Sequence, residues 1–260
     1  MLKYGRLPRV FNSEVPHFSA MKFMKGVQRP VLPPDCHVVL PDNLGYMNND
    51  KLGCCTIAGL GHAEQVFTSF AQGSMITVPD DCVLQGYEEA CGYNPADQSI
   101  DGSNPTDNGG VEQNVLTWAA NMGFPQADGS RRKLMGFIEI DPHNPEHLCE
   151  AIYECGVVYI GFEVPENLPE TAGSIWAGNT EMGAISGGHC VIITGFTNPA
   201  SPTYDVCSWG LPFKADQAFI SKYCDEAYGL FSSQWIKDNG KSPWGFDMPT
   251  IQAMMQALHQ

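Results

Sequence analysis

The sequence has few basic residues and no long apolar run, and both absences exclude classes of function. Lys and Arg number 14 against 29 Asp and Glu, which gives a formal net charge of −15. A chain this acidic repels polyanions, so we expect neither nucleic acid nor an anionic membrane surface as a partner. Apolar runs such as 157–162 and 190–194 are broken or ended by glycine, far short of the length that spans a bilayer.

The first residues also lack an apolar segment after their charges, and no cysteine pair has the C-x-x-C spacing. We therefore expect no secretory signal, a cytoplasmic protein and mostly reduced thiols, although the ten cysteines leave room for a structural disulfide. His143 and His147 are four residues apart, but Pro145 lies between them and Asn144 is a good N-cap, so only His147 belongs to the helix. We expect no metal site, and no motif predicts a cofactor.

The charge is divided unevenly along the chain. Residues 1–31 hold six of the basic residues and one acid, a local charge of +5, whereas the remainder carries −20. We expect residues 1–35, which are rich in proline and charge, to form an extended basic arm before an acidic body at 36–260. Two interpretations stay open. Either the arm lies on its own body, or it binds a neighbouring subunit in a homo-oligomer.

Hydrophobic periodicity divides the body into a helical part and a part with strands. Apolar residues spaced three and four apart predict a helix over 55–71, and two further helices are expected over 80–90 and 111–122. Later in the chain, short apolar runs separated by turns predict strands, with one helix at 145–154. The expected strands are 134–140, 156–162, 189–196 and 204–208. This pattern indicates an α+β protein with a helical lobe over about 36–125 and a β-rich lobe over about 126–260.

A candidate nucleophile stands where the first predicted helix begins. Unpaired backbone N–H groups at a helix N-terminus favour an anion, so a cysteine there has a lowered pKa and attacks more readily. Cys55 occupies this position, and its neighbour Cys54 is the alternative nucleophile. The candidate base is His189 in the segment SGGHCVIITGF, where two glycines permit close backbone approach beside a cleft.

Five segments in order resemble landmarks of the papain-like cysteine peptidases, in which a similar separation divides the catalytic Cys and His. They are LPDNLGYMNNDKLGCCTIA, NGGVEQNVLTWAANMGF, PEHLCEAIYECGVVYIGFEV, GGHCVIITGF and VCSWG. The resemblance implies a two-lobe papain-like fold, with Cys55 as nucleophile and His189 as base. Asn49 stands six residues before Cys55, where the family has the oxyanion-hole Gln, and Trp209 matches the Trp that covers the His.

Two features depart from the family pattern. The Asn that orients the catalytic His falls on Cys207, and a thiol is a poor replacement for an amide. Either Asp205 or a backbone carbonyl orients His189 instead, or the site is a dyad, or it is inactive. There is also no recognisable inhibitory propeptide, since only about forty residues precede the first landmark.

These observations support two hypotheses. The first is a thiol hydrolase that cleaves amide bonds of a peptide or protein substrate. The resemblance implies that its substrate cleft lies between the lobes and is lined by parts of Gly183 to Gly188 and by the loop around Asn108 to Gly110. The alternative is a catalytically inactive papain-like domain, serving as a structural or binding component of an assembly such as a virus particle and located in the virion. Cys207 and the charged arm favour this alternative. Deamidation or acyl transfer at the same residues is a third interpretation.

Overall fold

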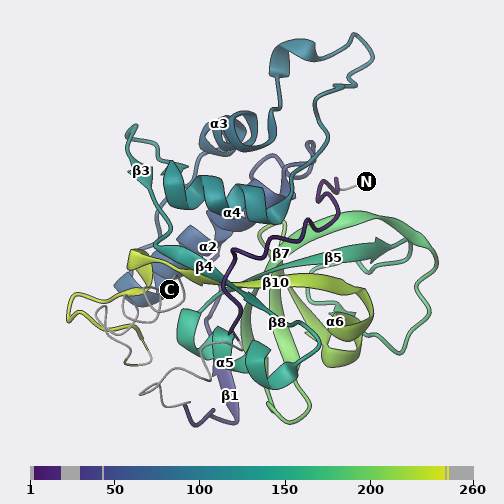
Figure 1. Cartoon of the computed structure of the whole chain (residues 1–260). Coiled ribbons are helices and arrows are strands. Elements are labelled where there is room, and N and C mark those ends of the chain that lie inside the picture. The colour runs from purple at the N-terminus through teal and green to yellow at the C-terminus, as the bar shows by residue number, and fades with distance from the viewer. Residues whose placement is uncertain (1–2, 19–29, 43, 244, 246–260) are drawn as a thin grey trace.

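The computed structural model describes residues 3–18, 30–42, 44–243 and 245. A sheet of eight strands forms the centre of this part of the chain, with the order β4-β10-β5-β7-β8-β9-β6 and with β1 paired to β7 (Figure 1). Its strands are β1 (Asp35–His37), β4 (Gly136–Ile140), β5 (Val158–Pro165), β6 (Ile175–Trp176), β7 (Ile185–Thr197), β8 (Thr203–Ser208), β9 (Leu211–Asp216) and β10 (Cys224–Phe231). Neighbouring strands are antiparallel except β6 and β9, which are parallel.

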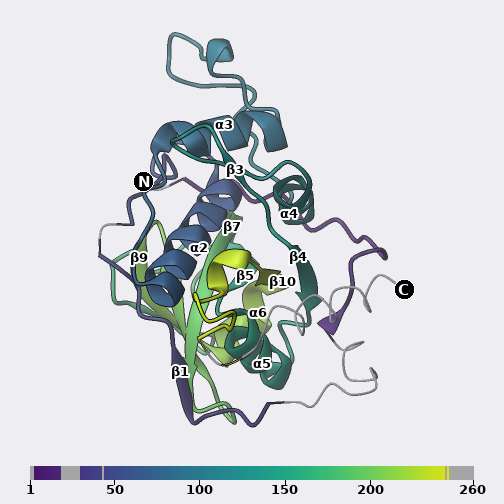
Figure 2. The ribbon, with the colours of Figure 1, turned by 90° about the vertical axis from the view of Figure 1, so that its left-hand side faces the viewer.

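Helices cover both faces of this sheet. The long helix α2 (Cys55–Gln72) packs against β7, and α3 (Asp80–Cys91) and α4 (Glu112–Asn121) complete the helical lobe (Figure 2). The opposite face is covered by α5 (Pro145–Cys155) and α6 (Gln217–Tyr223). Short elements complete the fold: the hairpin β2 (Phe124–Pro125) and β3 (Arg131–Arg132), and the 3-10 turns η1 (Pro95–Asp97) and η2 (Ser233–Trp235).

Alternation along β5 divides the hydrophobic core in two. Val158, Ile160 and Phe162 belong to the core under α5 and α6, whereas Tyr159 belongs to the core under α2. Such two-residue periodicity is required of a strand that is covered on both faces. The Tyr159 hydroxyl also donates to the carbonyl of Thr56 at 2.6 Å, which ties the first turn of α2 to the sheet.

The predicted α+β class and the predicted helices are confirmed, and the four expected strands correspond to β4, β5, β7 and β8. The sequence patterns predicted neither α6 nor the strands β1, β6, β9 and β10. The β10 segment CDEAYGLF carries two acids, a composition typical of a surface turn. In the structure Glu226 is buried beneath the N-terminal arm instead. All ten cysteines are free, so none forms the disulfide that the sequence left open.

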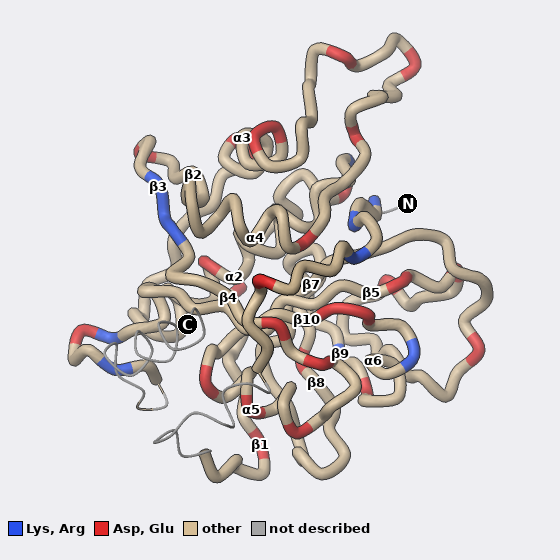
Figure 3. The backbone as a smooth tube through the Cα atoms, in the orientation of Figure 1, with Lys and Arg blue, Asp and Glu red and all other residues tan. Residues whose placement is uncertain are grey.

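The basic arm lies on its own body over residues 3–18. Arg6 forms a parallel bridge with Gly110, and His17 forms one with Glu139. Arg9 pairs with Glu139, and Figure 3 shows acidic residues along β10, which this arm crosses. Lys22, Lys25 and Arg29 lie outside the described residues, as does the second half of the arm before residue 30. Among the described helices, none has the length and hydropathy needed to cross a bilayer.

Candidate active site

The N-terminus of α2 distinguishes between the two adjacent cysteines. Cys54 is the N-cap, and its carbonyl accepts from the backbone N–H groups of Ile57 and Ala58 at 2.9 Å. Its thiol donates to the carbonyl of Met47 at 3.5 Å and therefore points into the preceding loop. Cys55 is the first residue of the helix, where the unpaired N–H groups favour a thiolate. The geometry thus favours Cys55 over Cys54 as the nucleophile.

Strand β7 carries His189 to the same point as Cys55. The backbone N–H of Cys190, the next residue along the strand, acts on the Cys55 thiol and lowers its pKa against a larger rise from burial. One turn into α2, a Cβ added at Gly59 would lie 3.4 Å from the Cys190 sulfur. The absence of a side chain at Gly59 lets the helix approach the strand closely here. The predicted nucleophile and the predicted base are therefore brought to one junction of α2 and β7.

A hydroxyl, not an amide or a carboxylate, orients the imidazole. His189 Nε2 lies 2.8 Å from the Oγ of Ser208, while its Nδ1 is buried and has no hydrogen-bond partner among the described residues. Asp205, which the sequence offered for this role, instead binds His37 and, at 2.7 Å, the amine of Lys214. Ser208 directly follows Cys207, and this adjacency was the only signal for it in the sequence.

Trp209 covers the imidazole, as the resemblance implied. The indole stacks on the His189 ring with centroids 4.5 Å apart and planes 21° from parallel. Trp209 has a φ of 52°, a left-handed conformation that is uncommon for a residue with a side chain, and Gly210 follows at 72°. This tight turn between β8 and β9 holds the indole over the ring and the Ser208 hydroxyl beside it.

Asn49 is buried at the edge of the same site. Its Nδ2 donates to the carbonyl of Leu52 at 3.2 Å and approaches the carbonyl of Lys3 at 3.5 Å. Its backbone is fixed by a turn in which its N–H donates to Tyr46 at 3.0 Å. An amide held in this way can donate to a carbonyl oxygen that enters the site, and in the structure that oxygen belongs to the arm.

The arm fills the cleft that the sequence predicted. Gly110 donates to the carbonyl of Gly5 at 2.8 Å and accepts from Leu7 at 2.9 Å. On the other side the N–H of Arg6 donates to the carbonyl of Gly188 at 3.0 Å. Residues 5–7 therefore lie between the two predicted walls, in the parallel direction relative to Gly110.

Side-chain contacts fix the arm directly over the candidate catalytic residues. The ring of Tyr4 meets His189 edge-on with centroids 5.4 Å apart, and its hydroxyl donates to Glu170 at 2.6 Å. Gly5 passes so close to the chain that a Cβ there would lie 1.8 Å from the carbonyl oxygen of Gly53. Only glycine permits the arm to take this path.

Burial keeps both groups uncharged at neutral pH. It raises the pKa of Cys55 to about 12, an effect that the N–H groups of Cys190 and Gly5 only partly oppose. It lowers the pKa of His189 to about 3, with a smaller contribution from His62. At neutral pH the closed site therefore holds a thiol and a neutral imidazole. His62 itself is a core residue whose Nε2 lies 2.9 Å from the carbonyl of Gly45.

Comparison with known proteins identifies the architecture. No protein-family model and no curated protein matches the sequence. Xylellain, a cysteine protease from Xylella fastidiosa, superimposes with a TM-score of 0.63 and 15% identity over 89% of this chain and 96% of that chain. Digestive procathepsin L 3 of the Tenebrio molitor larval midgut gives 0.54 and 11% over 88% and 75%. The Carica candamarcensis cysteine protease CMS1MS2, in complex with E-64, gives 0.51 and 15% over 77% and 99%. The shared feature is the fold.

Proposed function

We propose that this chain, which has the papain-like fold, is a cysteine peptidase whose cleft is closed by its own residues 3–7. Cys55 is the nucleophile, His189 the base and Ser208 the group that orients the base. The observation that carries the proposal is the environment of His189. One ring nitrogen is held by a hydroxyl and the other is buried and has no hydrogen-bond partner among the described residues. His189 also directly precedes Cys190, whose backbone N–H acts on the helix-start thiol of Cys55.

The reaction follows from these positions once the arm leaves. His189 takes the Cys55 proton, and the thiolate attacks the substrate carbonyl carbon to form a carbon–sulfur bond. The oxyanion accepts hydrogen bonds from the Asn49 amide and the Cys55 N–H. His189 then gives its proton to the departing amine as the carbon–nitrogen bond breaks. Water hydrolyses the thioester that remains, leaving the acid and the restored thiol.

Displacement of the arm is the first step of this scheme. Exposure of the cleft removes the burial that keeps the Cys55 thiol protonated and the His189 ring neutral. The helix N-terminus and the proton-accepting ring then favour a thiolate at neutral pH. Closure by the arm would keep the peptidase inactive until the arm is displaced.

The test uses a substitution that the closed arm has no room for. Gly5→Ala places a methyl group 1.8 Å from a backbone oxygen and should unseat the arm in the full chain. We expect iodoacetamide near pH 6 to label Cys55 selectively in this variant and slowly in the wild type. Gly187→Ala is the matched control, because its Cβ would lie at an ordinary 3.5 Å from Tyr4. Equal labelling of the ten cysteines in both variants would contradict the proposal.

The assembly hypothesis is a second proposal for the rest of the arm, with the cytoplasm or the virion as location. The described basic residues of the arm, Lys3, Arg6 and Arg9, pair within the chain. We therefore assign Lys22, Lys25 and Arg29 to a neighbouring subunit. Replacement of these three by Ala should abolish any oligomer seen by light scattering. An unchanged mass would remove this proposal and leave the peptidase untouched.

A further inference from the structure

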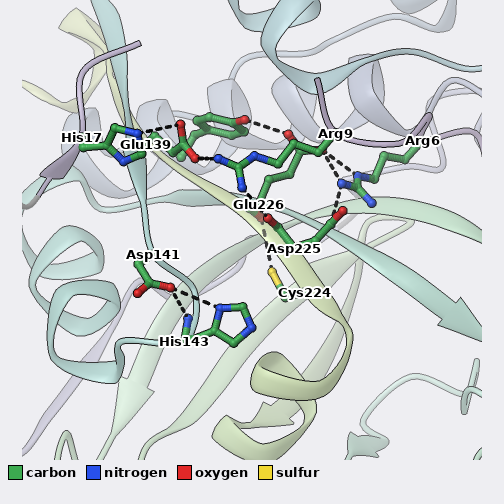
Figure 4. A network of polar contacts seen from close by, with 10 residues as sticks. Arg6, Arg9, His17, Glu139, Asp141, His143, Cys224, Asp225 and Glu226 are labelled. Carbon is green, nitrogen blue, oxygen red and sulfur yellow. Dashed lines mark hydrogen bonds and ion pairs between the residues drawn. The ribbon is translucent and has the colours of Figure 1, made fainter. Parts of the chain in front are cut away.

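One arginine of the arm is buried among carboxylates beside the candidate active site. The side chain of Arg6 is 2% exposed, although it belongs to a surface segment. Its Nε donates to Glu226 Oε1 at 2.9 Å, and its Nη2 pairs with the same oxygen and with Asp225 Oδ1, the latter at 2.5 Å (Figure 4). The side chain of Glu226 is fully buried. Its second oxygen accepts from Tyr228 at 2.7 Å.

A third carboxylate faces the same guanidinium. Glu112, the first residue of α4, is fully buried and lies 3.5 Å from Arg6 Nε, and the Cys190 thiol is its other polar neighbour. Burial raises the pKa of Glu112 and of Glu226, and the Arg6 charge opposes both rises. The pocket therefore has three acidic side chains, Glu112, Asp225 and Glu226, around the single positive charge of Arg6.

The shape of the pocket also suits a long cationic side chain. Gly161 of β5 forms its wall, where a Cβ would lie 2.3 Å from Arg6 Nε and 2.4 Å from Glu112 Oε1. Any other residue at this position would fill the space that the guanidinium occupies. The pocket opens beside Gly110 and Gly188, the two residues that hold the arm backbone over the cleft.

The cost of burying carboxylates determines which substrate side chain can take the place of Arg6 when the arm leaves. A buried carboxylate without a partner is strongly unfavourable, whereas a guanidinium satisfies two oxygens at once through its planar fork. An apolar substrate side chain would leave Glu112 and Glu226 buried without a counter-charge. An acidic one would add repulsion. A basic side chain restores the arrangement seen with Arg6.

We propose that the pocket of Glu112, Gly161, Asp225 and Glu226 is the specificity pocket of the enzyme and selects peptides with arginine, or secondarily lysine, at the position that Arg6 imitates. This inference rests on the proposed function. The arm then acts as a bound mimic of the preferred substrate. A pocket that merely anchors the arm would hold Arg6 without discriminating among substrates.

The first experiment measures binding without catalysis. The full chain carrying Gly5→Ala and Cys55→Ser is titrated by calorimetry with the acetylated, amidated peptide KYGRLP, which copies residues 3–8, and with the same peptide containing citrulline in place of arginine. Citrulline keeps the shape and removes the charge. We expect the arginine peptide to bind about 10- to 100-fold more tightly. Equal binding, or no binding of either peptide, overturns the inference.

The second experiment measures hydrolysis by the Gly5→Ala chain. Fluorogenic peptides carry Arg, Lys, citrulline or Leu at each of the three residues before the cleaved bond in turn. We expect an arginine preference at one position, of about 10- to 100-fold in kcat/KM over citrulline. Adding Glu226→Gln should reduce it to near unity. Adding Glu139→Gln, which removes another buried carboxylate that pairs with the arm, should leave it intact.

The two readouts separate the two proposals. Arginine-selective binding without hydrolysis of any peptide contradicts the proposed peptidase activity but supports the arginine-selective pocket. Hydrolysis without preference for a basic residue contradicts the pocket and leaves the peptidase. The arginine and citrulline peptides are compared on a protein with an unchanged pocket. Misfolding of the Glu226→Gln variant therefore cannot produce either result.

Discussion

His189 Nε2 lies 2.8 Å from the hydroxyl of Ser208, at the place in the fold where the resemblance implied an Asn. A serine hydroxyl can donate to this nitrogen or accept from it, so it serves both the neutral and the protonated ring. Trp209 stacks on the imidazole that makes this bond. The substitution of Cys207 for Asn therefore does not leave the imidazole without an orienting group.

The first prediction concerns this hydroxyl. Ser208→Ala in the Gly5→Ala background should lower kcat by about tenfold with little change in KM, because one hydrogen bond to the base is lost. Ser208→Thr, which keeps the hydroxyl, should restore most of the rate. In the profile of kcat against pH, the part that reflects ionisation of His189 should also shift in the Ala variant. An unchanged kcat and pH profile would show that the ring is oriented otherwise.

A second prediction compares the two arginines of the arm. Arg6→Ala leaves Glu226 and Glu112 without a counter-charge, so it should release the arm and increase the rate of Cys55 labelling. It should also lower the thermal midpoint of unfolding. Arg9→Ala breaks a partly exposed pair with Glu139 outside the cleft and should leave the labelling rate near that of the wild type. An equal increase in the Cys55 labelling rate for both variants would argue against the claim that Arg6 in particular holds the arm in the cleft.

The third prediction uses His62, whose pKa burial lowers to about 4. Unfolded His titrates near its ordinary value of about 6.5, so between these pH values the unfolded state binds a proton that folded His62 does not. Stability from this residue is present at neutral pH and is lost as the pH falls. Between these two pKa values the free energy of unfolding should therefore fall more steeply in the wild type than in His62→Gln, by at most about 1.4 kcal/mol per pH unit. The free energy of unfolding is measured by urea denaturation at several pH values from 7 to 4.5. The same pH dependence in the two proteins would contradict this prediction.

The fourth prediction tests the pocket wall. Gly161→Ala fills the space beside Arg6 Nε and Glu112, so it should reduce kcat/KM for arginine peptides in the Gly5→Ala background. Peptides with a small neutral residue at that position should be cleaved at an unchanged rate. Such a split distinguishes a blocked pocket from general damage to the site. Equal losses for both kinds of peptide would point to the latter.

Sequence patterns predicted the parts of this structure that periodicity and local chemistry determine. The helix over 55–71 has an apolar face, and Cys55 stands at its start, so both could be read directly. These two features depend on neighbouring residues in the chain. The walls at Gly110 and Gly188 were expected from the resemblance to the papain-like peptidases.

The remaining features depend on contacts between distant residues. Ser208 reaches His189 across two paired strands, and the sequence gives no sign that the hydroxyl replaces the adjacent Cys207. Glu226 pairs in the buried region with Arg6, which lies 220 residues earlier in the chain. The arm was read as a basic strap from its charge, but only the fold reveals that it occupies the cleft.

The central claim is that Cys55 is a catalytic nucleophile closed off by the arm. The most direct test is hydrolysis of an arginine-containing fluorogenic peptide by three full-length chains: wild type, Gly5→Ala, and Gly5→Ala with Cys55→Ser. We predict slow cleavage by the first, faster cleavage by the second and none by the third. Cleavage that persists without the Cys55 thiol, or is absent from the Gly5→Ala chain, would contradict the account.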